Sequence, residues 1–435
     1  MRFINYFYLY PKAKFKFMLY SKMADTLVGS EIIKIASEVN DLKKSGKQIS
    51  NLTIGDFNPE HYPIPEKFRD YINAAYKKGF TNYPPAGGVL ALTQSISKFI
   101  QKNFGLEYRT EEIQVSGGSR PLIYALYLSL LDNNDKVVFP VPSWNNNHYC
   151  HLTGASPVMV MGKPENNFMP TAEDFKPHLK GAVILALCSP LNPTGTMFSE
   201  QGLKEICEMV LEENAQRSPS QKPLILMYDQ IYSLLTYGKH QHFNPVKLVP
   251  AMRDYTVNID GASKGFASTG VRVGWAFGPQ RIMEKMKAII SHIGAWAPTA
   301  EQNAMGEFLS NSENVEEFLN DHKFKLQRSL EALYRGIKSL KEEGLPVDAI
   351  EPMGAIYLTL KIDILGKKTP EGLVLNNSME VTLYLIHQAG LALVPFTAFG
   401  DSNNSPWFRA SVGACSFKEI EQVMPRLKSS LSALV

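Results

Sequence analysis

The chain has 435 residues with 45 basic and 42 acidic side chains, which gives a formal net charge of +3 at pH 7. Hydrophobic residues make up 44% and charged residues 20% of the chain, which is typical of a globular protein and excludes a disordered or fibrous one. The small net charge, without a long basic run, gives no support for nucleic-acid binding. No stretch approaches the roughly 18 apolar residues that span a membrane.

Residues 1–24 are predicted to form an N-terminal extension. Their sequence is aromatic and basic, and it lacks the apolar core and small-residue cleavage site of a signal peptide. We expect either a disordered extension or sequence upstream of a start at Met18 or Met23.

The four cysteines are widely spaced and form no C-x-x-C motif. This pattern predicts free thiols and a cytoplasmic location rather than a disulfide framework. Cys188 ends the apolar run AVILALC and is expected to be buried.

Helical periodicity and short apolar runs alternate from about residue 70 onward. Apolar side chains recur at helical spacing over 89–104, 120–131 and 199–215, and Ser199 is the predicted N-cap of the last helix. Because hydrophobicity in the intervening runs is continuous rather than alternating, both faces of their sheet should be covered. This predicts a largely parallel α/β sheet. The predicted strands are 135–142, 181–190, 223–232, 255–263 and 271–279.

The C-terminal part has a different pattern. Residues 300–340 are mostly helical, with a predicted break at SNSEN, and a strand at 354–363 follows. A helix at 377–389, a strand at 407–413 and a last helix from Ser416 complete a smaller α+β unit. The length of the chain also favours two domains. We predict a segment at 25–69 that joins the small domain, a large domain at 70–305 and a small domain at 306–435.

Polar residues follow the predicted strands, where ligands of parallel sheets gather. Asn192 follows the second strand, Asp229 and Tyr232 lie at the end of the third, and Lys264 and Arg272 lie at the ends of the next two runs. The loop SGGSR opens a helix, so its free amides predict a phosphate site, with Gly118, Ser119 and Arg120 as contacts. Taken alone, that loop is an ordinary helix cap.

Together these residues fit one chemistry. A buried lysine is neutral enough to attack an aldehyde and form a Schiff base. A carboxylate facing a pyridine nitrogen keeps that nitrogen protonated, and an arginine with a helix N-terminus holds a phosphate. These are the requirements of pyridoxal 5′-phosphate (PLP). No metal is expected, because His240 and His242 lack a third ligand.

The order and spacing of these motifs resemble those of the class I/II aminotransferases. Asn192 in N-P-T-G, Asp229 in D-x-x-Y, Lys264 in S-K and Arg272 before V-G-W are separated by 37, 35 and 8 residues. Four other stretches also resemble segments of this family, so the resemblance extends from about residue 25. They are LTIGDFNPE, TNYPPAGGVLAL, PVPSWNNNHY and WFRASVGA. It implies a fold-type-I PLP-dependent transferase, with a mostly parallel seven-stranded sheet in a large domain and a smaller α+β domain.

The resemblance also implies roles for single residues toward the cofactor. Lys264 would hold PLP as a Schiff base and then move the proton between the substrate Cα and the cofactor C4′. Asp229 would pair with the ring nitrogen, and Asn192 and Tyr232 would hydrogen-bond the phenolate oxygen. The phosphate would be enclosed by Gly118, Ser119, Arg120, Ser263 and Arg272, with Trp144 stacked on the ring.

Two further implied roles concern the substrate and the partner subunit. Arg409 would clamp the substrate α-carboxylate, which Gly55 would cover, with Asn192 also in contact. Tyr83 would reach the phosphate bound by the neighbouring subunit, which implies a homodimer with shared active sites.

The predicted reaction is ping-pong transfer of an α-amino group between an amino acid and a 2-oxo acid through a pyridoxamine-phosphate form. An amino-acid lyase or decarboxylase is the alternative, because it would use the same cofactor and lysine. A cofactor-binding regulator would need a DNA-binding domain, for which residues before Ala24 leave no room.

Three positions depart from the family pattern. Phe396 stands where a glycine is usual, near the expected mouth of the substrate pocket, and its bulk is expected to reshape that pocket. Gly261 stands where many relatives have a phosphate-binding serine, a role we assign to Ser263. Dicarboxylate-specific relatives have a second arginine in the segment that corresponds to SHIGAWAPTAEQ, and this chain has none there. We therefore expect Trp296 either to line an apolar or aromatic side-chain pocket or to pack in the dimer interface.

Overall fold

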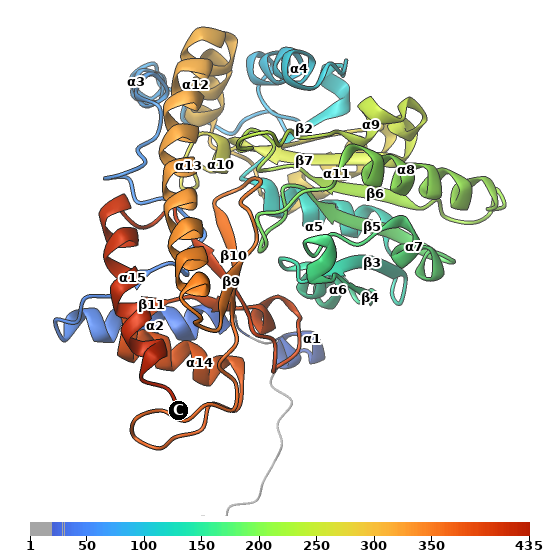
Figure 1. Cartoon of the computed structure of the whole chain (residues 1–435). Helices are drawn as coiled ribbons and strands as arrows, with labels where there is room; N and C mark the ends of the chain where they lie inside the picture. The colour runs from blue at the N-terminus through green and yellow to red at the C-terminus, as the bar shows by residue number, and fades with distance from the viewer. Residues whose placement is uncertain (1–19, 28, 30) are drawn as a thin grey trace, which may run out of the picture.

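The computed structural model describes residues 20–27, 29 and 31–435 (Figure 1). A seven-stranded sheet has the order β2-β8-β7-β6-β5-β3-β4. β8 is antiparallel to both of its neighbours, and the other pairs are parallel. The predicted largely parallel α/β sheet is therefore confirmed. Its strands are β2 (Ile113–Ser116), β3 (Lys136–Val141), β4 (Ser156–Met161), β5 (Ala182–Cys188), β6 (Ile225–Asp229), β7 (Thr256–Gly261) and β8 (Gly274–Phe277).

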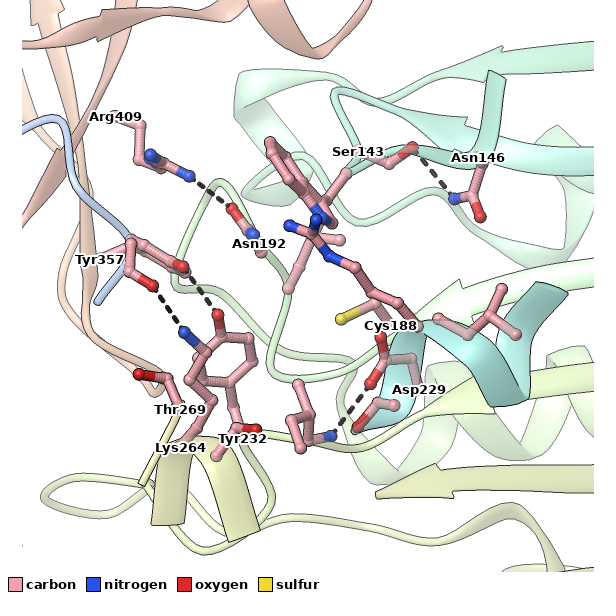
Figure 2. A pocket seen from close by; sticks show the side chains of 18 of the residues that line it. Ser143, Asn146, Cys188, Asn192, Asp229, Tyr232, Lys264, Thr269, Tyr357 and Arg409 are labelled. Carbon is pink, nitrogen blue, oxygen red and sulfur yellow. Dashed lines mark hydrogen bonds between the residues drawn. The ribbon is translucent and has the colours of Figure 1, made fainter. Parts of the chain in front are cut away.

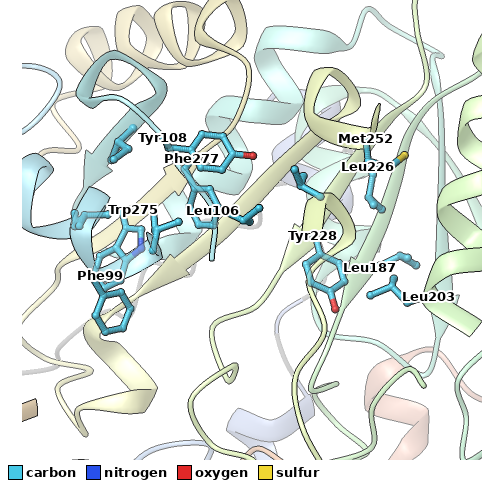
Figure 3. Packing of buried hydrophobic residues seen from close by; sticks show 14 of the residues in the cluster. Phe99, Leu106, Tyr108, Leu187, Leu203, Leu226, Tyr228, Met252, Trp275 and Phe277 are labelled. Carbon is cyan, nitrogen blue, oxygen red and sulfur yellow. The ribbon is translucent and has the colours of Figure 1, made fainter. Parts of the chain in front are cut away.

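Both faces of the central strands of this sheet are buried, as continuous hydrophobicity requires. Successive residues of a strand point to opposite faces, and in β5 Ile184 and Leu185 belong to two different hydrophobic clusters. Helices α5 (Ser119–Leu130) and α11 (Gln280–Ile293) pack on the Ile184 face, and α8 (Glu200–Ala215) packs on the other. Figure 3 shows part of the cluster on the α8 face, in which Leu187, Leu203, Leu226, Tyr228 and Met252 lie together.

Helix ends and breaks follow the capping signals in the sequence. The Ser199 side chain accepts from the backbone N–H of Gly202 and so caps α8 as predicted. The predicted break at SNSEN lies between α12 (Thr299–Ser310) and α13 (Ser312–Glu342), where Asn311 caps the second helix. Ser416 likewise caps the last helix, α15 (Phe417–Ser432).

A second hydrophobic core surrounds a four-stranded antiparallel sheet of order β12-β13-β10-β9. Side chains of α13 and α15 belong to this core, and Figure 1 shows both helices beside the sheet. The N-terminal segment reaches the same part of the molecule, because β1 (Ser50–Asn51) pairs with β11 (Leu391–Ala392). The remaining strands are β9 (Val347–Ala349), β10 (Tyr357–Ile362), β12 (Val394–Pro395) and β13 (Trp407–Ser411).

The predictions for the N-terminus are only partly within the described residues. Residues 1–19 of the expected extension lie outside them, and its last residues begin a short exposed helix. None of the helices that the structure describes is long and apolar enough to cross a membrane. The remaining helices are α1 (Lys22–Thr26), α2 (Glu31–Lys44), α3 (Glu66–Lys77), α4 (Leu90–Phe104), α6 (Asn146–Thr153), α7 (Ala172–Phe175), α9 (Pro245–Leu248), α10 (Ala262–Gly265) and α14 (Ser378–Tyr384).

The cysteines are free thiols in the described part of the chain. Three of them are buried, but Cys188 is only half-buried, which corrects the expectation from its apolar run. The reason is its position: it is the last residue of β5 and lines a cavity at the end of the sheet.

Candidate active site

A cavity of about 700 Å³ lies where β5, β6 and β7 end, and residues of both cores line it. The strand ends place polar side chains there because parallel strands share one carboxyl edge. Figure 2 shows Asp229, Lys264, Asn192 and Arg409 converging on this space. Eleven of the predicted site residues line it, namely Gly55, Ser119, Arg120, Trp144, Asn192, Asp229, Tyr232, Ser263, Lys264, Arg272 and Arg409.

Lys264 lies in the short helix α10, directly after β7. Its Nζ donates a hydrogen bond to the backbone carbonyl of Gly55 at 2.5 Å. Burial lowers the pKa of Lys264 to about 8. The negative charge of Asp56 acts to raise this pKa, and the Arg409 guanidinium acts to lower it further. The amine therefore loses its proton more readily than a surface lysine, as a nucleophile must.

Asp229 is the last residue of β6 and faces the same cavity. Its Oδ1 accepts from the backbone N–H of Ile231 at 3.1 Å. Burial raises the pKa of Asp229 to about 6, while that hydrogen bond and Lys264 act to lower it. A carboxylate in this environment gains from a cationic partner, which a protonated ring nitrogen would supply.

Arg272 and the start of α5 form a cradle for an anion. Arg272 has φ 62° and donates to the carbonyls of Thr269 at 2.6 Å and Gly117 at 2.9 Å. Gly118 has φ 95°, and a Cβ placed there would lie 2.7 Å from Arg272 Cζ, so only glycine permits this approach. No side chain of the described residues caps the first turn of α5, and its amides therefore suit a phosphate.

Arg409 is 2% exposed and projects from β13 into the cavity. Its Nη1 donates to Asn192 Oδ1 at 3.0 Å, and its Nη2 donates to the Thr53 carbonyl at 2.6 Å. The guanidinium carbon lies 4.7 Å from the centroid of the Tyr357 ring. No carboxylate of the described residues pairs with this buried cation, so it is suited to an anionic ligand.

Comparison with known proteins agrees with this geometry. A profile of the family "Aminotransferase class I and II" matches residues 47–427. The chain belongs to the class I and II aminotransferases. The predicted family, fold and transferase class are therefore confirmed.

Individual aminotransferases are similar to this one over most of their length. The aspartate aminotransferase of Rhizobium meliloti (strain 1021) is 28% identical over 408 residues, which cover 93% of this chain and 94% of that protein. The aspartate aminotransferase of Geobacillus stearothermophilus is 30% identical, with 89% and 93% covered. The crystal structure of the Rhizobium meliloti enzyme has a TM-score of 0.87 at 26% identity, covering 96% of this chain and 99% of that one.

Two predicted contacts of this aminotransferase do not line the cavity. Gly118 lies directly behind the lining, against Arg272. Tyr83 is 86% exposed, and its ring centroid lies 5.2 Å from that of Trp296. Its role toward a partner subunit stays a prediction.

The departures from the family pattern have structural explanations. A Cβ at Gly261 would lie 2.9 Å from Gly274 Cα and 3.0 Å from the Val273 carbonyl oxygen, so a serine would be crowded there. Phe396 is fully buried against Phe168 and does not line the cavity, so it cannot reshape the pocket directly.

Sequence reasoning missed several residues of the site. The Tyr357 hydroxyl lies 2.7 Å from that of Tyr232, which the resemblance had assigned to the cofactor oxygen. Asp56 accepts from Thr269 Oγ1 at 2.5 Å, and both line the cavity. The position of Asp56 next to Gly55 in LTIGDFNPE was the available signal. For Tyr357, within an ordinary apolar strand, there was none.

Proposed function

We propose that the cavity binds pyridoxal 5′-phosphate and that the enzyme transfers an α-amino group between an amino acid and a 2-oxo acid. One observation carries this proposal: Lys264, Asp229 and Arg272 line a single cavity, where Asp229 ends β6, Lys264 follows β7 and Arg272 precedes β8. The glycine cradle at Gly118 and the uncapped start of α5 fit a phosphate. The residues present therefore suit the cofactor.

When bound, PLP supplies an electron sink that makes the substrate Cα–H acidic. Lys264 supplies the amine that attaches to the cofactor and that accepts and returns this proton, a role that its lowered pKa supports. Asp229 holds a proton on the ring nitrogen through its negative charge. Arg272, Ser263 and the first amides of α5 orient the phosphate.

Arg409 is the proposed anchor of the substrate α-carboxylate. It is buried and already fixed by Asn192 and Thr53, so little side-chain entropy is lost when a carboxylate binds. The names of the relatives make aspartate the first amino donor to test. An aromatic donor is the second to test; Trp296 does not line the cavity of its own chain, so it could contact such a donor only in a dimer.

A symmetric homodimer is the proposed assembly. Tyr83 supports this assembly, because it is 86% exposed and lies outside the cavity of its own chain, where it could reach the cofactor of a second copy. The cytoplasmic location stays a prediction from the cysteine pattern.

A half-reaction tests the proposed function. Purified holoenzyme is mixed with one amino acid at a time, without an oxo-acid acceptor, and the products are identified by mass spectrometry. An aminotransferase converts one equivalent of donor per active site to the oxo acid, with loss of the visible cofactor absorption. Continued product formation without an acceptor would instead support a lyase or decarboxylase.

A further inference from the structure

A network of buried polar side chains joins the ends of β6 and β7, next in sequence to Asp229 and before Lys264. Its members are 0 to 4% exposed. Asn244 Nδ2 donates to Gln230 Oε1 and to Asn258 Oδ1, both at 2.8 Å. Gln230 Nε2 in turn donates to Asp260 Oδ2 at 3.0 Å.

Backbone groups fix the direction of every hydrogen bond in this network. The N–H of Val246 donates to Asn244 Oδ1 at 2.9 Å, and Asn258 Nδ2 donates to the Phe277 carbonyl at 3.4 Å. A backbone N–H cannot become an acceptor, and a carbonyl cannot become a donor. Asn244 must therefore present its amide N–H groups to Gln230, and Gln230 must present its own to Asp260.

Asp260 consequently faces a donor on each carboxylate oxygen. Gln230 Nε2 donates to Oδ2, and the backbone N–H of Gly261 donates to Oδ1 at 2.7 Å. An asparagine would turn its amide N–H groups toward one of these donors, which leaves buried groups unsatisfied. A protonated acid could still accept at both oxygens, but its O–H would be a further buried donor that needs an acceptor of its own. The ionised carboxylate accepts both hydrogen bonds without adding such a donor.

We propose that Asp260 is a positioning residue whose ionised carboxylate fixes the segment that carries Ser263 and Lys264. Its backbone carbonyl also accepts from Ser119 Oγ at 2.9 Å, so the same residue ties the start of α5 to this segment. The link to cofactor binding rests on the proposed function, whereas the requirement for an anion does not. Burial and the charge of Asp229 raise the pKa of Asp260 to about 7, against the hydrogen bonds from Gln230 and Gly261, so the ionised form that the network favours is complete only above neutral pH.

An exchange of donor and acceptor between two positions tests this proposal. Asp260→Asn places an amide N–H against Gln230, and Gln230→Glu places two carboxylates together. The double variant Q230E/D260N restores complementarity, because the carboxylate introduced at position 230 would accept both from the amide introduced at position 260 and from Asn244. Asp254→Asn is the matched control, since Asp254 lies exposed six residues before Asp260.

Two readouts are measured on all variants: the Tm of the apoprotein, and the dissociation constant for PLP by titration. We expect each single variant to lose several degrees in Tm and D260N to lose about tenfold in PLP affinity. The double variant should regain much of both losses, and D254N should match the wild type. A single variant that fails to fold while the double variant folds supports the proposal equally.

Additive losses in the double variant, or a double variant that fails to fold, would overturn the required hydrogen-bond pattern. Unchanged PLP affinity in D260N with a restored Tm in the double variant would overturn the positioning role alone. A wild type that does not bind PLP at all would instead refute the proposed function, and the apoprotein Tm cycle would still decide the ionised state of Asp260.

Discussion

Gly118→Ala tests the phosphate cradle with a single methyl group. A Cβ at this position would lie 2.7 Å from Arg272 Cζ and 3.1 Å from its Nη1, so the guanidinium must move. Movement breaks its hydrogen bond to the Gly117 carbonyl and withdraws it from the proposed phosphate. A hydrogen bond to a charged group contributes about 1.5–3 kcal/mol, so PLP affinity should fall about 10- to 100-fold.

The backbone strain of alanine at positive φ is controlled separately. Gly344 has φ 90°, close to the 95° of Gly118, and a Cβ there meets nothing within 4 Å. Gly344→Ala should therefore cost stability through the backbone alone. Both variants are titrated with PLP as apoproteins and melted. If Gly118→Ala binds PLP as tightly as Gly344→Ala does, Arg272 does not hold the phosphate and the cradle is wrongly assigned.

Three further predictions concern single side chains. Lys264→Ala should abolish turnover and the covalent attachment of PLP, while the Tm of the apoprotein changes little. Attachment is measured by borohydride trapping and mass spectrometry. Trapped cofactor in this variant would disprove the assignment. Arg409→Ala should raise KM for amino donors at least tenfold with the cofactor absorption unchanged, and steady-state kinetics with an unaltered KM would remove the carboxylate anchor. Burial raises the pKa of Asp229 from 3.8 to about 6, so ionisation costs the folded apoprotein stability as pH rises through that interval. Asp229→Asn should therefore be the more stable apoprotein at pH 7, by at most about 3 kcal/mol, and equal to wild type only about a pH unit below 3.8. Equal melting temperatures at both pH values would refute the shift.

The central sheet was predictable because buried parallel strands have a distinctive sequence pattern. β5 is hydrophobic throughout since helices cover both its faces, and continuous hydrophobicity predicts that burial. β4 was not predicted. It lies at the sheet edge, where Met159 and Met161 are 51% and 49% exposed, and its pattern depends on neighbours that periodicity does not specify.

The site was predictable where a residue follows a strand and missed where partners come from distant segments. Asp229 ends β6 and Lys264 follows the neighbouring strand β7, so topology alone brings them together. Tyr357 reaches Tyr232 from 125 residues away in sequence, because both side chains belong to the hydrophobic core around the four-stranded sheet. Nothing in the sequence distinguishes Asp260 from an ordinary strand residue, because its donors are the Gln230 side chain and the Gly261 backbone, whose directions the sequence does not specify.

The charges of the cavity connect binding with folding. Four cations line it, from Arg120, Lys264, Arg272 and Arg409, against two carboxylates, from Asp56 and Asp229. Besides burial, the three arginines lower the pKa of Lys264, so the cations repel one another in the unliganded protein. A ligand with a phosphate, and then a substrate with a carboxylate, removes that repulsion. The free energy that is lost by placing these cations close together is thus recovered on binding. A site that binds anions tightly is therefore also locally unstable when no anion is bound.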